Sequence, residues 1–156
     1  HLSSHDIIGF DSETKPSFKK GVINEVCLLQ ISTFNTCYLF RLNQIGFPDD
    51  LKALMEDESI TKIGLSLKDD MRGLRRITST KPKGFIDLQE AVVDYGIEDR
   101  SLKKISGIVL GKRISKKQRL TNWESDKLSE AQQRYAATDA WICLKIYNKL
   151  TNNINE

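Results

Sequence analysis

Residues 6–13 read Asp-Ile-Ile-Gly-Phe-Asp-Ser-Glu, a short apolar run that ends in two acidic residues. Isoleucine and phenylalanine favour strands, and an uninterrupted apolar run of this length is typical of a buried strand. We therefore predict a buried strand over residues 6–10, with Asp11 and Glu13 directly after it. A strand this early in the chain indicates a sheet protein, and the kind of sheet follows from the elements after it.

The rest of the chain alternates between strand and helix patterns. Two strand patterns follow the first and are joined at a turn through Asn35, so they are predicted to form a hairpin. Beyond the hairpin, shorter apolar runs alternate with stretches of helical apolar spacing. The predicted strands cover 25–33, 37–42, 59–65 and 85–87, and the predicted helices cover 48–57, 69–77, 88–95, 101–110 and 129–150. This order predicts an α/β fold with a mixed sheet, since the hairpin argues against an all-parallel one.

The composition indicates one globular domain. The chain has 156 residues, of which 39% are hydrophobic and 29% charged, and this length supports a self-sufficient core. No apolar run approaches the ~20 residues needed to span a bilayer, and residues 1–10 show no signal-peptide pattern. We expect a single domain over residues 1–156 with no membrane association, and we expect that some N-terminal residues of the parent protein are missing.

The cysteines and histidines argue against several kinds of chemistry. Cys27, Cys37 and Cys143 are odd in number and widely spaced, so neither a disulfide framework nor a zinc site is expected. His1 and His5, the two histidines of the chain, stand at its start, which argues against histidine-based catalysis. Free cysteines indicate an intracellular, reducing location, and we expect a cytoplasmic protein.

Asp11 and Glu13 form the first candidate site. Positions i and i+2 of a strand point to the same face, so both carboxylates can be presented together. Neighbouring carboxylates repel unless a cation joins them, and Mg²⁺ or Mn²⁺ prefers such hard oxygen ligands. The alternative is a solvated turn with two surface acids, which is common for this pattern.

Further acidic residues occur at similar places. Tyr135 and Asp139 are one turn apart on the last predicted helix, and Asp69 and Asp70 begin an earlier one, while Asp87 ends a short strand. Capping and the helix dipole alone can explain an acid at a helix start. Ligand sites of α/β sheets nevertheless gather at strand ends. The acids together therefore predict a metal cluster, in which two ions ~3.5–4 Å apart would support phosphoryl displacement.

Basic residues crowd the segment before the last helix, where a polar, irregular stretch is expected over 111–127. They predict contacts with nucleic-acid phosphates, although a solvated basic loop is the alternative. One aromatic residue lies close by. The predicted nucleic-acid contacts are Lys112, Arg113, Lys116, Lys117, Arg119 and Trp123. A second, smaller basic group consists of Arg72, Arg75 and Arg76.

Four stretches of the sequence resemble the motifs of a known family. They occur in the same order as in that family and extend along nearly the whole chain. They are GFDSETKPSF at 9–18, VCLLQIS at 26–32, KIGLSLKDD at 62–70 and LTNWESDKLSEAQQRYAATDAWICLKIY at 120–147. Together they are similar to the 3′–5′ exonuclease domain of the ribonuclease D and Werner exonuclease group, the DEDD exonucleases. Tyr135, four residues before the last aspartate, indicates the tyrosine subtype.

The resemblance implies a fold, an activity and a set of site residues. It implies a ribonuclease H-like fold with a central five-stranded mixed sheet flanked by helices, and two divalent cations, Mg²⁺ or Mn²⁺. The family's second-motif aspartate sits six residues after a strand glycine, here Gly64, which favours Asp70 over Asp69. The implied catalytic residues are Asp11, Glu13, Asp70, Tyr135 and Asp139, and the implied metal ligands are the same set without Tyr135.

The implied reaction releases nucleoside 5′-monophosphates from a nucleic acid with a free 3′ end, and no obligate protein partner is expected. Asp11, Glu13 and Asp139 would hold the first ion, Asp11 would bridge to the second, and Asp70 would act on the second through water. Tyr135 would orient the attacking water. Two alternatives remain open, which are a non-catalytic nucleic-acid-binding module on the same fold and a nuclease for very short oligonucleotides.

Overall fold

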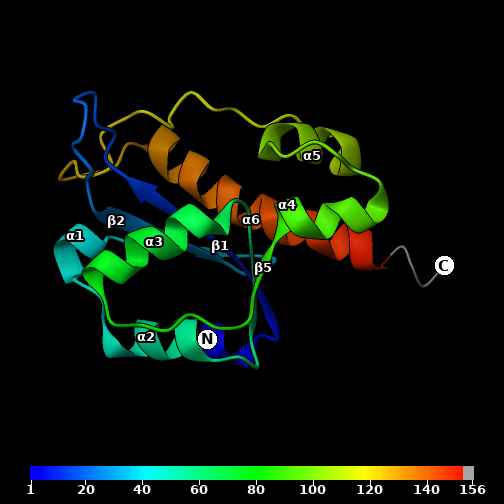
Figure 1. Cartoon of the computed structure of the whole chain (residues 1–156), viewed down its shortest axis with the longest axis horizontal. Coiled ribbons are helices and arrows are strands. Elements are labelled where there is room, and N and C mark those ends of the chain that lie inside the picture. The colour runs from blue at the N-terminus through cyan, green and yellow to red at the C-terminus, as the bar shows by residue number, and fades with distance from the viewer. Residues whose placement is uncertain (153–156) are drawn as a thin grey trace.

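The computed structural model describes residues 1–152, so the last four residues of the expected domain 1–156 lie outside the described part. Figure 1 shows a sheet covered by helices. The strands are β1 (Ile7–Thr14), β2 (Val26–Ser32), β3 (Cys37–Phe40), β4 (Thr61–Gly64) and β5 (Phe85–Asp87). The α-helices are α1 (Leu42–Ile45), α2 (Asp49–Glu56), α3 (Leu67–Ile77), α4 (Leu88–Ala91), α5 (Leu102–Leu110) and α6 (Glu130–Asn152). Two 3₁₀ turns cover Leu2–Ser4 and Val92–Tyr95.

The sheet is mixed and five-stranded, in the order β3-β2-β1-β4-β5. β1 pairs antiparallel with β2 and parallel with β4. β2 pairs antiparallel with β3, and β4 pairs parallel with β5. The predicted α/β class with a mixed five-stranded sheet is therefore confirmed.

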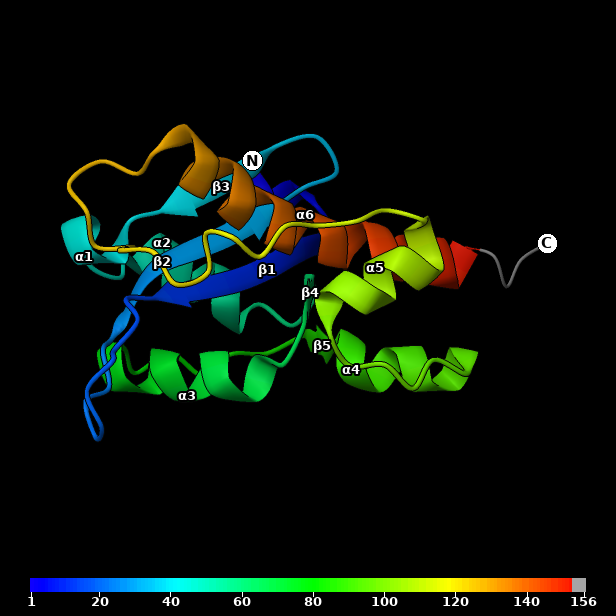
Figure 2. The same cartoon turned by 90° about the horizontal axis from the view of Figure 1, so that it is seen from above.

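Two layers of helices bury the sheet, which is why β2 is buried along its whole length. Figure 2 shows α6 on one side of the sheet and α3 on the other. Ile8 and Phe10 of β1 belong to the core that packs under α2 and α3. A second core lies between α5, α6 and the β4 side of the sheet.

Helix α6 approaches β1 unusually closely because both elements carry small residues at the contact. A Cβ atom at Gly9 would lie 2.1 Å from the carbonyl oxygen of Ala140, and Ala136 and Ala140 are fully buried. Side chains alternate along a strand, so Asp11 and Glu13 share the face of Gly9. This alternation aims both acids toward α6.

A capping box marks the start of this helix. The Ser129 amide donates to Gln132 Oε1 at 3.0 Å, and the Gln132 amide donates to Ser129 Oγ at 3.2 Å. Together these bonds fix where α6 begins, and hence which of its residues meet β1.

The helix predicted over 88–95 is α4 followed by the 3₁₀ turn over Val92–Tyr95, and β1 and β3 also differ in extent from the prediction. β1 continues to Thr14, so Asp11 and Glu13 lie within the strand and not after it, because β2 pairs with them as far as Val26. β3 ends at Phe40, and the short helix α1 follows where the strand was expected to continue. Among the described residues, no helix is long and apolar enough to cross a membrane.

Candidate active site

Three of the predicted carboxylates meet where α6 crosses β1. Asp11 and Glu13 of β1 and Asp139 of α6 each offer a ligand oxygen within 4.8 Å of the others. Asp139 is only 9% exposed, and the two β1 acids are partly buried. The contact between Gly9 and Ala140 brings these residues together across more than a hundred residues of sequence.

Asp70 lies beside this group, and the structure separates it from its neighbour. The Ser12 hydroxyl, on the strand between the two β1 acids, donates a hydrogen bond to Asp70 Oδ1. Asp69 points away, since its side chain is 76% exposed and pairs with Arg72 at 3.3 Å. Because successive helical residues differ by about 100° in direction, only one of the two can face the sheet.

Asp87, by contrast, has the structural role expected of an acid at a helix start. Its carboxylate accepts from the backbone amides of Ser66, Leu67 and Gln89, at 2.8–2.9 Å. It thereby caps α4 and holds the beginning of α3. This cap fixes the position from which Asp70 reaches the other acids.

Burial and mutual repulsion disfavour the charged forms of the four acids. Desolvation raises the pKa of Asp11 well above its usual value, and the charges of Asp70, Glu13 and Asp139 raise it further. Desolvation and the same repulsion raise the pKa of Glu13 to about 8. Burial raises the pKa values of Asp70 and Asp139 to about 6. Such a set of carboxylate oxygens fits a bound divalent cation, which would replace the missing solvation.

Tyr135 lies on α6 one turn before Asp139 and interacts with it through a hydrogen bond that lowers the aspartate pKa. Desolvation and the nearby carboxylates raise the pKa of the Tyr135 hydroxyl, so the phenol keeps its proton. Its ring packs against that of Trp123, with centroids 5.8 Å apart. Tyr135 is thus a fixed hydroxyl next to the acids.

The prediction that Trp123 contacts nucleic acid is wrong in this structure. Its side chain is fully buried, and Nε1 donates to the carbonyl oxygen of Arg119 at 3.3 Å. The polar segment around Trp123 predicts an exposed ring, whereas in the structure this ring forms a small core with Cys27, Leu28 and other residues. Trp123 supports the Tyr135 ring from behind.

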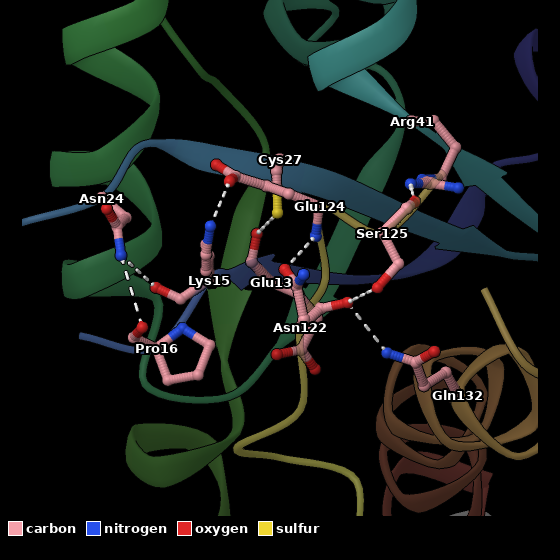
Figure 3. A network of polar contacts seen from close by, with 10 residues as sticks. All are labelled: Glu13, Lys15, Pro16, Asn24, Cys27, Arg41, Asn122, Glu124, Ser125 and Gln132. Carbon is pink, nitrogen blue, oxygen red and sulfur yellow. Dashed lines mark hydrogen bonds and ion pairs between the residues drawn. The ribbon is translucent and has the colours of Figure 1, made fainter. Parts of the chain in front are cut away.

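Polar contacts tie the segment before α6 to the end of β1 and to α6, and tie β2 to β1 (Figure 3). Lys15 pairs with Glu124 at 3.2 Å, and Gln132 Nε2 donates to the Asn122 carbonyl at 3.1 Å. Cys27 Sγ donates to the Glu13 carbonyl at 3.4 Å. These contacts give a segment without regular structure a defined position beside the acids.

The basic residues of this segment differ in their distance from the acids. Arg119 lowers the pKa of Glu13 and Lys116 lowers that of Asp139, so both lie near the carboxylates. Lys117 lines a hollow of about 250 Å³ beside Tyr135. Lys112 and Arg113 are exposed and line neither of the two hollows that adjoin the acidic group.

Gln30 and Ser12 are site residues that the sequence analysis did not single out. Gln30 pairs with Asp11 in the sheet and is fully buried, and its amide lowers the pKa of Glu13 by hydrogen bonding. This interaction lies outside ordinary hydrogen-bond geometry, by which neither Gln30 amide atom has a partner. A glutamine in the apolar run 26–32 was the signal available in the sequence.

Carboxylates from the central strand and from α6, with basic groups beside them, form a site that fits a divalent cation on a ribonuclease H-like fold. A family model described as 3′–5′ exonuclease matches residues 1–155. The chain belongs to this 3′–5′ exonuclease family, whose DEDD-type members are metal-dependent.

Individual proteins and structures similar to this chain are also nucleases or share their fold. The chain is 37% identical over 157 residues to the mouse bifunctional 3′–5′ exonuclease/ATP-dependent helicase WRN, covering 97% of this chain and 11% of that protein. Escherichia coli RNase D, described as an exoribonuclease involved in structured RNA processing, shares the fold with a TM-score of 0.84 at 24% identity, over 99% of this chain and 41% of that one. Brucella melitensis NrnC bound to pGG has a TM-score of 0.80 at 25% identity, over 97% and 74% of the two chains. The chain thus spans a small part of its mouse relative.

Proposed function

We propose that this chain is a 3′–5′ exonuclease that hydrolyses nucleic acid from a free 3′ end and releases nucleoside 5′-monophosphates. The observation that carries the proposal is the meeting of Asp11, Glu13 and Asp139 within 4.8 Å, with Asp70 beside them. A protein that only bound nucleic acid would gain nothing from buried acids near phosphates, because they repel them. Membership of the exonuclease family supports the same reaction.

In the proposed site, each acid has a defined task. Asp11, Glu13 and Asp139 would hold one divalent cation, Mg²⁺ or Mn²⁺, Asp11 would also reach a second, and Asp70 would act on the second through water. Bound cations of this kind acidify water and stabilise charge on the attacking and leaving oxygens. Ser12 orients Asp70 by its hydrogen bond.

Tyr135 orients the attacking water in this proposal and does not remove its proton. The hydroxyl keeps its own proton at neutral pH because burial and the surrounding carboxylates raise its pKa. A protonated phenol one turn from Asp139 can donate or accept a hydrogen bond at a fixed position. Trp123 maintains this position by packing on the ring.

A nucleic-acid substrate fits the charges around the acids. Lys116 and Arg119 act on the carboxylates, and Lys117 lies beside Tyr135. Cationic side chains there would contact phosphates whatever the base sequence. Escherichia coli RNase D is an exoribonuclease and Brucella melitensis NrnC binds pGG, which supports nucleic acid as the substrate class.

The test uses 5′-labelled single-stranded DNA, single-stranded RNA and recessed duplex, each with Mg²⁺, Mn²⁺ or EDTA. We expect a ladder that shortens from the 3′ end and is absent in EDTA. Asp70→Asn should abolish the ladder, and Asp94→Asn is the control, since Asp94 is exposed and lines neither hollow beside the site and should leave the ladder intact. Cleavage that persists in EDTA would overturn the proposal, as would equal activity of the two variants.

We also propose an intracellular, cytoplasmic location. Cys27, Cys37 and Cys143 are free thiols, and burial raises their pKa values, to about 11 for Cys27 and about 12 for Cys37. Thiols with raised pKa values are poor nucleophiles and are expected to stay reduced in the cytoplasm. Fractionation of cells that express the chain tests this location, and its recovery from the secreted fraction would contradict it.

A further inference from the structure

A cleft of about 540 Å³ leads away from the acidic group along α3. Three parts of the chain form it, namely the end of β1 with the loop 15–25, the exposed side of α3, and residues 119–120. Figure 2 shows the loop 15–25 beside the end of α3. Glu13 and Asp70 line the cleft at its inner end, so it is continuous with the proposed catalytic site.

Cationic side chains line two sides of this cleft. Arg72 and Arg76 are one turn apart on α3, and Arg119 lies across from them on the segment before α6. Arg76 comes six residues after Asp70, which is about 9 Å along the helix axis. Within residues 1–152, neither Arg76 nor Arg119 forms an ion pair, so both are available to anions. Arg72 forms an exposed pair with Asp69, which a phosphate would have to displace.

Exposed apolar side chains gather at the same cleft. Val22, Ile23 and Leu120 line it with exposed fractions of 48%, 68% and 58%. Phe18, on the same loop, is 84% exposed. Four of the seven large apolar side chains that are exposed among the described residues thus belong to two short segments. A concentration of exposed apolar side chains marks a binding surface, because apolar side chains that stay in contact with water do not stabilise the fold.

We propose that this cleft binds the single-stranded part of the nucleic acid immediately 5′ of the bond being cut. The proposal rests on the proposed exonuclease function. An exonuclease has a single nucleotide on the 3′ side of that bond, so a cleft that continues along α3 serves the other side. Phosphates pair with Arg72 and Arg76, and unpaired bases contact Ile23 and Leu120, which line the cleft.

Because arginines and exposed apolar side chains line the same cleft, it is expected to bind a single strand in preference to a duplex. Bases in a duplex are stacked on one another and expose only their edges, whereas unpaired bases offer flat faces to apolar side chains. The cleft also implies a preference for substrates longer than a dinucleotide, since a dinucleotide has too little chain 5′ of the bond to reach Arg76.

The test compares hydrolysis of a dinucleotide with that of a single strand of about 12 nucleotides, a length within the range of single-strand binding sites. Arg76→Ala and Ile23→Ala should each lower kcat/KM on the longer strand by about tenfold, and by much less on the dinucleotide. Arg75→Ala and Ile108→Ala are matched controls, because both are exposed and neither lines the cleft. Both controls should behave as the unchanged protein.

Equal losses on both substrates, or no loss on either, would overturn the proposal. A wild-type chain that prefers the dinucleotide would also overturn it and would favour a nuclease for very short oligonucleotides. If no substrate is cut at all, the exonuclease proposal fails, but the cleft can still be tested by anisotropy of a labelled single strand in EDTA. Arg76→Ala should then weaken binding and reduce its salt dependence, while unchanged binding would refute the cleft.

Discussion

Gly9→Ala tests the close approach of α6 to β1 on which the acidic group depends. The added methyl group would lie 2.1 Å from the carbonyl oxygen of Ala140, 2.9 Å from its carbonyl carbon and 3.2 Å from Leu144 Cβ. Atoms in ordinary contact are about 3.5 Å apart, so the methyl group is roughly 1.4 Å too close to that oxygen. The nearest atoms are backbone, which cannot rotate away, so α6 has to move.

The displacement predicts a loss of both stability and activity. Overpacking of this kind costs about 1–3 kcal/mol, which for a chain of this length lowers Tm by roughly 2–12 °C. Asp139 precedes Ala140 and would move with it, away from Asp11 and Glu13. A shift of about 1 Å in a catalytic group can cost about 100-fold in rate.

The assay pairs urea or thermal unfolding with exonuclease activity measured well below Tm, so that unfolded protein does not contribute. Gly107→Ala is the matched control, because a Cβ there meets no atom within 4 Å and the residue lies in α5. It should stabilise the chain by about 0.4–1 kcal/mol and keep full activity. The reasoning is refuted if Gly9→Ala changes stability by less than about 0.5 kcal/mol and retains full activity.

Three other variants or conditions test the site itself. Asp139→Asn should lower activity by more than about 100-fold. It should also raise the Tm of the metal-free chain, because it removes a buried carboxylate whose pKa is raised to about 6, and an unchanged or lower Tm would contradict this. In EDTA, stability should fall as the pH rises from 4.5 toward 8, because folded Glu13 retains a proton that the unfolded chain loses over this range. Calorimetry from pH 5 to 8.5 checks the sign, and a Tm that increases with pH would exclude it, while added Mg²⁺ should restore stability at the higher pH. Gln30→Leu should raise by about tenfold the Mg²⁺ concentration needed to increase Tm, because its amide orients Glu13; an unaltered Mg²⁺ titration would argue that Gln30 only fills space.

Most elements of the fold could be predicted from the sequence because their signals are local. The helix predicted over 69–77 is α3 with a start two residues earlier, and the helix predicted over 129–150 is α6 within two residues at each end. The strand predicted over 25–33 is β2 within one residue at each end, and the structure buries every residue of it. Strand ends were harder to predict, since β1 continues through polar residues that only pairing with β2 keeps extended.

The sequence by itself determined which site residues share a face, namely Asp11 with Glu13 and Tyr135 with Asp139. Spacings of two in a strand and four in a helix fix the direction of a side chain without reference to the rest of the chain. Only the tertiary structure brought Asp139 to Asp11 and turned Asp70 toward them, because both depend on how elements far apart in sequence pack. The same holds for Trp123, whose burial follows from the packing of a segment with no regular pattern of its own. Periodicity reports the direction of a side chain within its own element, whereas contacts between distant elements depend on the packing of the whole chain.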